Sequence, residues 1–193
     1  MMSTRGGEKL RKSMVDKQSK KSWLNAALKA LASGGIDKVR VESLAKNLGV
    51  TKGSFYWHFK DREQFLDELL NFWAEQSTQT VIANPDYPTD SRARVRAVAE
   101  DIVRRDLGGM DPHIRSWTQY DKRRRKVVAM IDKKRFEFLR DLFAAAGFST
   151  SGARLRAQSL YRYVLGEPFI SVRESMGQRL QRMQAHIDLL LRE

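Results

Sequence analysis

The most constraining feature of the sequence is a pair of short amphipathic segments close together in its first third. The first covers residues 41–48, the second covers residues 52–59, and a turn that contains Gly49 joins them. Isolated helices of fewer than about 12 residues are marginal in water, so each segment has to pack against other parts of the chain. Two short helices joined by a glycine-containing turn are typical of a helix-turn-helix. The sequence therefore predicts a helix-turn-helix at residues 41–60, packed through Leu44, Ala45, Leu48, Val50, Phe55 and Phe59.

A longer helix is predicted before this pair. Its apolar residues recur at the spacing i, i+3, i+4, i+7 between Leu24 and Leu31, which indicates a helix over residues 17–33. Gly34-Gly35 ends it, because glycine adopts the left-handed cap conformation without strain. Residues 1–15 have no apolar periodicity and are predicted to form a flexible basic arm. The first domain is therefore expected at residues 16–62, with three helices.

The rest of the chain, residues 63–193, is predicted to form a second helical domain. Asp61 is expected to cap a fourth helix, with Gln64 completing a capping box. A loop is predicted at residues 84–90, because two prolines and several turn-forming residues cluster there. Further helices are expected at residues 92–106, 112–120, 122–146, 152–173 and 178–192. The predicted fold class is all-α, with about nine helices and no convincing strand.

The charge of the chain is high and uneven. The formal net charge is +13, and residues 1–62 carry 14 Lys and Arg against 5 Asp and Glu. A basic first third favours a module that binds a polyanion, although charge alone does not separate DNA from RNA or an anionic membrane. No apolar run approaches the roughly 20 residues of a membrane span. We therefore expect a cytoplasmic protein.

Several kinds of chemistry lack support in the sequence. There is no cysteine, so disulfides, thiol nucleophiles and thiolate metal sites are excluded. The three histidines are too scattered to indicate a metal site, and no Ser-His-Asp or phosphate-loop signature is present. We expect no metal, no cofactor and no enzymatic activity.

The second short segment carries residues suited to DNA. Gly53, Ser54 and Trp57 lie roughly opposite the apolar side, Tyr56 and His58 flank them, and Lys60 and Arg62 follow the helix end. The N–H groups and positive dipole at the start of this segment, beside Lys52, favour phosphate. Donors for the DNA backbone and short polar residues near the bases are therefore both available.

These motifs resemble the DNA-binding domain of the tetracycline-repressor (TetR) family. The residues that carry the resemblance are Leu44-Ala45, Gly49-Val-Thr-Lys-Gly-Ser54, Phe55-Tyr-Trp-His-Phe59 and Arg62 before Phe65-Leu66. It is strong over about residues 17–70. It implies three N-terminal helices that bind DNA, followed by a variable helical domain that binds a small molecule and dimerises. It also implies DNA contacts for Thr51, Lys52, Gly53, Ser54, Tyr56, Trp57, His58 and Arg62. Val41 departs from the Ser or Thr that family members often carry at the start of the second helix, and Arg62 replaces a more usual Lys.

Two further surfaces are expected in the second domain. The resemblance favours a dimer interface, a four-helix bundle built from the last two helices of two copies, through Leu160, Val164, Phe169, Met183, Ile187 and Leu190. The alternative is that both faces pack internally, as the apolar face of any amphipathic helix can. The candidates for an effector pocket are aromatic: Trp73, Trp117, Tyr120, Phe138 and Tyr161. The alternative for each is ordinary core.

The functional hypothesis is a dimeric transcriptional repressor. It binds a palindromic operator on double-stranded DNA, and an unknown small-molecule effector releases it. Two alternatives remain open at this point: an architectural DNA-binding protein without ligand control, and an enzyme whose catalytic groups meet only in space.

Overall fold

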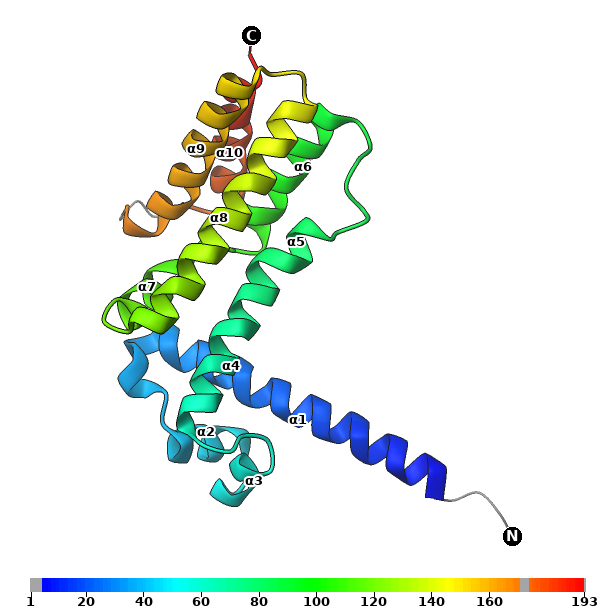
Figure 1. The fold of residues 1–193 in the computed structure, drawn as a ribbon, viewed down its shortest axis with the longest axis vertical. Coiled ribbons are helices and arrows are strands. Elements are labelled where there is room, and N and C mark those ends of the chain that lie inside the picture. Colours follow the sequence, from blue (N-terminus) through cyan, green and yellow to red (C-terminus); the bar gives the residue numbers. More distant parts are fainter. Residues whose placement is uncertain (1–4, 171–173, 193) are drawn as a thin grey trace. The chain divides into compact units, whose positions relative to one another are not determined.

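The computed structural model describes residues 5–170 and 174–192. Within these ranges every regular element is a helix, which confirms the all-α prediction (Figure 1). If the segment from Arg62 to Ile82 is counted as one continuous helix, the described residues form nine α-helices. None of the described helices is long and apolar enough to cross a membrane.

The first compact unit spans residues 1–73. Its helices are α1 (Arg5–Gly34), the 3₁₀ turn Ile36–Lys38, α2 (Val41–Leu48), α3 (Lys52–Tyr56) and α4 (Arg62–Ala74). The predicted bounds of α2 are confirmed. The prediction for the arm is wrong over residues 5–15, where the backbone is helical and continuous with the rest of α1. Residues 1–4 of the arm lie outside the described residues.

The second compact unit spans residues 74–193. The helix that begins as α4 continues through the π-helical turn Glu75–Gln79 into α5 (Thr80–Ile82). After the expected loop come α6 (Ser91–Arg104), α7 (Asp111–Thr118), α8 (Lys122–Ala145), α9 (Thr150–Gly166), the 3₁₀ turn Glu167–Phe169 and α10 (Met176–Leu190). The last part of the helix predicted for residues 152–173 falls on residues 171–173, outside the described residues.

The division between the units lies later in the chain than the expected boundary after residue 62. The reason is the apolar face of α4, where Phe65, Leu66 and Leu69 are buried. Phe65 packs on Phe55 and Phe59 with ring centroids 5.2 and 4.8 Å apart. The fourth helix therefore completes the core of the first unit.

Side chains cap several of the helices at their N-termini. Asp61 accepts a hydrogen bond from the Gln64 N–H at 2.8 Å, and the Gln64 side chain accepts one from the Lys60 N–H at 2.6 Å. This is close to the predicted capping box, displaced by one residue on the return bond. Asp90, Asp121 and Ser149 cap α6, α8 and α9, and Ser175 forms a complete capping box at α10. These caps fix where the helices of the second unit begin.

The core of the second unit lies among four long helices. α8 packs beside α9, α6 packs beside α10, and α6 also contacts α8 (Figure 1). Leu160 on α9 and Met183 and Ile187 on α10 are buried in this core, and Val164 and Leu190 pack against it. The prediction that these five residues form a dimer interface is therefore wrong for the fully buried Leu160, Met183 and Ile187, because their own protomer already covers them.

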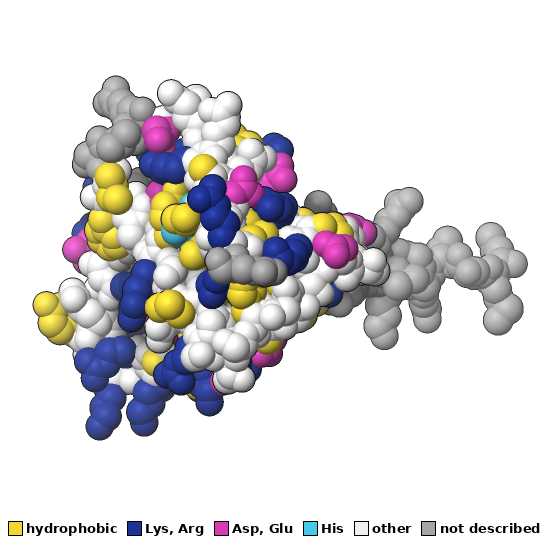
Figure 2. Space-filling model, turned by 90° about the horizontal axis from the view of Figure 1, so that it is seen from above, with side chains coloured by type: hydrophobic (Ala, Val, Ile, Leu, Met, Phe, Trp, Pro, Cys, Tyr) yellow, Lys and Arg dark blue, Asp and Glu magenta, His cyan; other side chains and the backbone are white. Residues whose placement is uncertain are grey.

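Charge is spread over the surface. Figure 2 shows Lys and Arg side chains in several groups on the face that it displays, with fewer acidic side chains and some hydrophobic ones between them. The excess of positive charge is therefore not restricted to one small patch of this face.

The core position of Leu160 predicts a large loss of stability on truncation. Leu→Ala at a buried site costs about 2–5 kcal/mol, so Leu160→Ala should lower the free energy of unfolding by that amount. Met130 on α8 is exposed; Met130→Ala should cost less than about 1 kcal/mol. Urea titration followed by circular dichroism measures both. Equal losses would show that Leu160 is not a core residue.

Candidate nucleic-acid interface

An aromatic cluster holds α3 in place. Phe55 and Phe59 are buried, with ring centroids 5.0 Å apart. Phe55 also packs edge-on against Trp23 of α1 at 5.4 Å. Although α3 ends at Tyr56, the Phe59 N–H donates to the Phe55 carbonyl at 3.0 Å, so the helical course continues to the second phenylalanine. A helix this short is not stable alone, and its position therefore depends on the ring contacts to its neighbours.

The opposite side of this segment is exposed. The side chain of Trp57 is 88% exposed, and Tyr56 is also well exposed. All nine residues predicted to bind DNA lie on or beside this one short segment. Thr51, Lys52, Gly53, Lys60 and Arg62 are exposed, whereas Ser54 and His58 are half-buried. The placement leaves all nine near solvent, and their DNA contacts stay a prediction.

The turn between α2 and α3 depends on glycine. Gly49 has a φ of 68°, in the left-handed region, and closes α2. The Val50 N–H then donates to the Ala45 carbonyl at 3.0 Å. This geometry ends α2 with no backbone strain and starts α3 three residues later.

Neither of the two short helices has a side-chain cap at its start. Thr51 precedes α3, but its side chain makes no capping hydrogen bond. Its hydroxyl is exposed at the start of the helix, where it remains available for an external partner. Arg40 precedes α2 and supplies no side-chain cap either.

Lys52 has a partner within the protein. Its ammonium group lies 2.5 Å from the carboxylate of Glu42 on α2, and both side chains are exposed. The hydrogen bond between them lowers the pKa of Glu42 and raises the pKa of Lys52. Glu42 therefore competes with a phosphate for the charge of Lys52, although the ammonium group has three N–H donors and can bind both. Sequence reasoning missed this pair because it joins two different helices.

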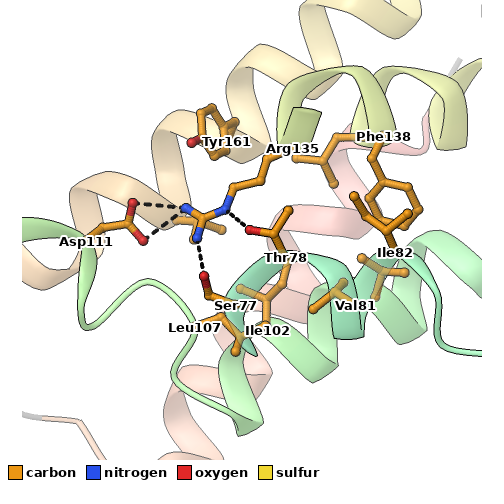
Figure 3. Close-up of a pocket in the computed structure, with 13 residues that line it drawn as sticks. Ser77, Thr78, Val81, Ile82, Ile102, Leu107, Asp111, Arg135, Phe138 and Tyr161 are labelled. Atoms are coloured by element: carbon orange, nitrogen blue, oxygen red, sulfur yellow. Dashed lines mark hydrogen bonds and ion pairs between the residues drawn. The ribbon is translucent and has the colours of Figure 1, made fainter. Parts of the chain in front are cut away.

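The predicted effector residues do not gather at one place. Phe138 and Tyr161 line a cavity of about 50 Å³ in the second unit (Figure 3). Tyr120 is 92% exposed, and the half-buried Trp117 lies under the guanidinium of Arg124, 5.7 Å from the ring. Trp73 is buried in the first unit. Of the five residues, the structure thus brings Phe138 and Tyr161 to this cavity, and an effector role for Trp73, Trp117 and Tyr120 stays a prediction.

A charged cluster that sequence reasoning missed reaches the same cavity through Asp111, Arg135 and Tyr161. Arg135 of α8 donates to both oxygens of Asp111 at 3.0 and 3.1 Å. Arg115 donates to Asp111 and to both oxygens of Asp132, and the Tyr161 hydroxyl donates to Asp132 at 2.6 Å. In the sequence these residues look like ordinary surface charges of amphipathic helices. Because most of the paired residues are far apart in the sequence, no local sequence pattern indicates the cluster.

The pKa values of the two carboxylates shift in opposite directions. Burial raises the pKa of Asp111, against the effect of Arg135 and Arg115. Burial also raises the pKa of Asp132, but hydrogen bonds from Arg115 and Tyr161 outweigh it, so the net pKa of Asp132 is lowered.

Among the residues that the structure describes, no cluster of His, Asp and Glu is arranged to hold a metal ion.

The aromatic cluster predicts opposite consequences for neighbouring residues. Phe59→Ala should lower the free energy of unfolding of the first unit by about 3–5 kcal/mol, because it opens a cavity in the core. Trp57→Ala should change it by no more than about 0.5 kcal/mol, because that ring is almost fully exposed. Thermal melts of the full chain compare the two. A destabilisation by Trp57→Ala that matches Phe59→Ala would contradict the assignment of the two faces.

Comparison with known proteins agrees with this geometry. Residues 24–69 match the model for bacterial regulatory proteins of the tetR family. The chain is 33% identical over 52 residues to the HTH-type transcriptional regulator AcrR of Shigella flexneri, over 27% of this chain and 24% of that protein. It is 37% identical over 59 residues to the class A tetracycline repressor of Escherichia coli, over 30% of this chain and 27% of that protein. The chain thus matches about a quarter of the length of these two relatives.

The fold is shared more widely than the sequence. A crystal structure described as a TetR-family regulator from Rhodococcus sp. superimposes with a TM-score of 0.67 at 18% identity, over 91% of this chain and all of the other. This likeness shows the fold alone, whereas the matched residues 24–69 include α2, α3 and the turn between them. Residues 24–69 therefore form a domain of the tetR family of bacterial regulatory proteins, and the chain shares the fold of a TetR-family regulator.

Proposed function

We propose that the protein is a dimeric transcriptional repressor that binds palindromic operator DNA through α3 and is released by a small-molecule effector. The observation that carries the proposal is the exposed side of α3, where polar and aromatic side chains face solvent on a helix fixed from behind by buried rings. The family model that residues 24–69 match is one of bacterial regulatory proteins, which supports a regulatory role. Because its proposed target is DNA, we infer that it acts in the cytoplasm.

Gly53 supports a close approach of DNA to α3. A Cβ at this position would meet only the Thr51 hydroxyl, at an ordinary contact distance of 3.6 Å. The packing of the protein therefore does not require glycine here, and glycine in a helix costs about 1 kcal/mol relative to alanine. At Gly53 the helix surface is exposed, basic residues are close and no side chain projects. A DNA backbone or base edge can therefore come close to the helix at this position.

This reasoning predicts that Gly53→Ala changes stability and DNA binding in opposite directions. The free energy of unfolding should rise by about 0.5–1 kcal/mol, because alanine favours the helix. Affinity for operator DNA should fall about tenfold or more, because the methyl group holds the helix away from the duplex. The operator is obtained by selecting duplexes from a random-sequence library with the parent protein. Binding is then measured by fluorescence anisotropy against random competitor DNA.

Gly177→Ala is the matched control. Gly177 lies exposed near the start of α10, where a Cβ would meet nothing closer than the Ser175 hydroxyl at 3.9 Å. This variant should gain stability and keep the parent's DNA affinity. Selection of no preferred duplex by the parent would favour the architectural alternative, since such a protein shows little sequence preference. A Gly53→Ala variant that binds as tightly as the parent would remove α3 as the DNA-binding element.

Apolar side chains on the outer side of the last helices support the dimer. Leu155 on α9, Phe169 in the 3₁₀ turn and Leu189 on α10 are exposed. The two helices meet near their ends, where the Arg156 guanidinium donates to the Leu190 carbonyl at 2.6 Å. Leu155 and Leu189 therefore belong to neighbouring helices, and a second copy that covers them would form a helical bundle. In this proposal Phe169 keeps its predicted role, and Leu155 and Leu189 replace the buried residues.

The dimer predicts a sedimentation mass of about 45 kDa, twice the chain mass of 22.3 kDa. Leu189→Glu should shift the protein toward the monomer, because it places a charge in the centre of an apolar interface. Leu189 is 59% exposed, and the control residue Met130 on α8 is 67% exposed. Met130→Glu should leave the dimer intact. A parent protein that sediments as a monomer at micromolar concentration, with and without DNA, would exclude the dimer.

The cavity of the second unit is the proposed effector site. Its walls are mostly aliphatic and aromatic, with the side chains of Arg135, Asp111, Ser77, Thr78 and Tyr161 as the polar groups (Figure 3). Small-molecule sites in proteins combine an apolar lining with a few placed polar groups in this way. Phe138 and Tyr161 keep their predicted role as lining residues in this proposal.

A further inference from the structure

The helix that begins as α4 changes type shortly after the boundary between the two units. Over Glu75–Gln79 it forms a π-helical turn, in which the Thr80 N–H donates to the Glu75 carbonyl, five residues earlier. Helices of this type make up well under 1% of residues. They occur mostly as single turns within α-helices, frequently at functional sites. The contacts that hold this turn are therefore informative.

Side chains replace the backbone bond that the π turn breaks. In a regular α-helix the Thr80 N–H would donate to the Gln76 carbonyl. Here that carbonyl accepts from the Thr80 hydroxyl at 2.7 Å and from the Arg105 guanidinium at 2.9 Å. The same guanidinium nitrogen lies 2.7 Å from the Thr80 hydroxyl oxygen. The Gln76 carbonyl, which the π turn leaves without its α-helical backbone partner, is therefore bonded by side chains.

Arg135 holds the other side of the turn from within the cavity. Its Nε donates to the Thr78 hydroxyl at 2.8 Å, and one terminal nitrogen donates to the Ser77 hydroxyl at 2.7 Å (Figure 3). The other terminal nitrogen binds Asp111. The Arg135 side chain is only 12% exposed, and Thr78 is buried. One buried guanidinium thus connects the π turn to α7, and all of these groups line the cavity.

The charges at the cavity select against a charged ligand. Arg115 and Arg135 face Asp111 and Asp132, so the two cations already match the two carboxylates. A ligand carboxylate would add a buried charge without a counter-charge, which is strongly unfavourable. An uncharged acceptor such as a carbonyl oxygen would instead accept hydrogen bonds from Arg135 in place of the two hydroxyls.

Because the cavity is small, such a ligand has to disturb the π turn in order to bind. A volume of about 50 Å³ holds a few water-sized groups. A ligand as large as a substituted aromatic ring has to displace part of the wall. Ser77 and Thr78 form the part of that wall held by side-chain hydrogen bonds, and a ligand acceptor on Arg135 removes those bonds.

We propose that Arg135 is the residue through which the cavity detects its ligand. An uncharged apolar molecule with one hydrogen-bond acceptor replaces Ser77 and Thr78 as the partner of Arg135. The freed π turn then becomes α-helical. Each residue of an α-helix turns the chain by about 100°, so the loss of the π turn rotates α4 relative to α5. This inference rests on the proposed function, because the rotation changes the direction in which the DNA-binding unit is presented.

A set of full-length variants tests the mechanism without a known ligand. Arg135→Gln and the double variant Ser77→Ala with Thr78→Val both remove the bonds to the turn and should mimic the ligand. Affinity for the selected operator duplex should fall about tenfold or more in each. Arg115→Gln is the control: the hydrogen bonds of Arg115 within the described part of the chain go to Asp111 and Asp132 and not to the turn. It should reduce stability and leave DNA affinity within about twofold of the parent.

A deletion separates this mechanism from simple loss of structure. Deleting the exposed Glu75 removes one residue from the π turn and turns it into α-helix, while the helix on either side keeps its orientation. The deletion variant should bind the operator like the parent, and adding Arg135→Gln should then have no effect on affinity. Equal weakening by Arg135→Gln in both backgrounds overturns the proposal. So does loss of operator binding in a Glu75 deletion variant whose circular dichroism and thermal melt match the parent. If the parent selects no duplex, the proposed function itself fails.

One-ring probes test the ligand class by calorimetry. Acetophenone carries an uncharged acceptor, isopropylbenzene has a similar shape without one, and benzoate carries a negative charge. Acetophenone should bind the parent about tenfold more tightly than either of the others, and Arg135→Gln should abolish that preference. Tightest binding of benzoate, or an acetophenone preference that survives Arg135→Gln, overturns the assignment of Arg135.

Discussion

The packing of Phe55 and Phe59 against Trp23 and Phe65 is the interaction on which the first unit depends. α3 has a single helical turn and no side-chain cap, so its own hydrogen bonds do not define its direction. The four rings fix the direction of α3, because edge-to-face contacts near 5 Å allow little movement without loss of contact. Every exposed residue of the segment, including Tyr56 and Trp57, takes its position from these buried neighbours.

The second unit uses a different kind of constraint. Its core of aliphatic and aromatic side chains would accept many arrangements of the adjoining helices, but the buried pair Arg135–Asp111 accepts few. Breaking such a pair leaves an uncompensated buried charge, which costs several kcal/mol by order of magnitude. The pair joins α7, α8 and the π turn in one bonded arrangement. In the mechanism that we propose, a ligand that competes for Arg135 acts on this bonded turn rather than on the apolar part of the cavity wall.

Local chemistry explains which features could be predicted from the sequence. The bounds of α2, the buried face of α3 and the entry to α4 follow from apolar spacing, glycine and the Asp61–Gln64 pair, all of which act over a few residues. Apolar spacing also identified the inner faces of α9 and α10. It did not say what covers those faces, and Leu160 and Met183 proved to be covered by their own protomer.

The remaining features depend on contacts between distant residues. Glu75 to Gln79 has no composition that separates a π turn from an α-helix, and the turn is held by Arg105 and Arg135 from other helices. The Lys52–Glu42 pair joins two helices in the same way. The extension of α1 to Arg5 lacks the apolar stripe that indicates a helix, so its charged residues suggested an arm instead.

Tryptophan fluorescence provides the most direct measurement of the central claim, that α3 presents its exposed side to DNA. Of the four tryptophans, Trp57 is 88% exposed, while Trp23 and Trp73 are buried and Trp117 is half-buried. Adding the selected operator duplex should quench the parent's emission and protect it from iodide, because Trp57 enters a contact with the duplex. Trp57→Phe should show neither change. If the Trp57→Phe variant responds to DNA as the parent does, then the exposed side of α3 is not the surface that meets the duplex.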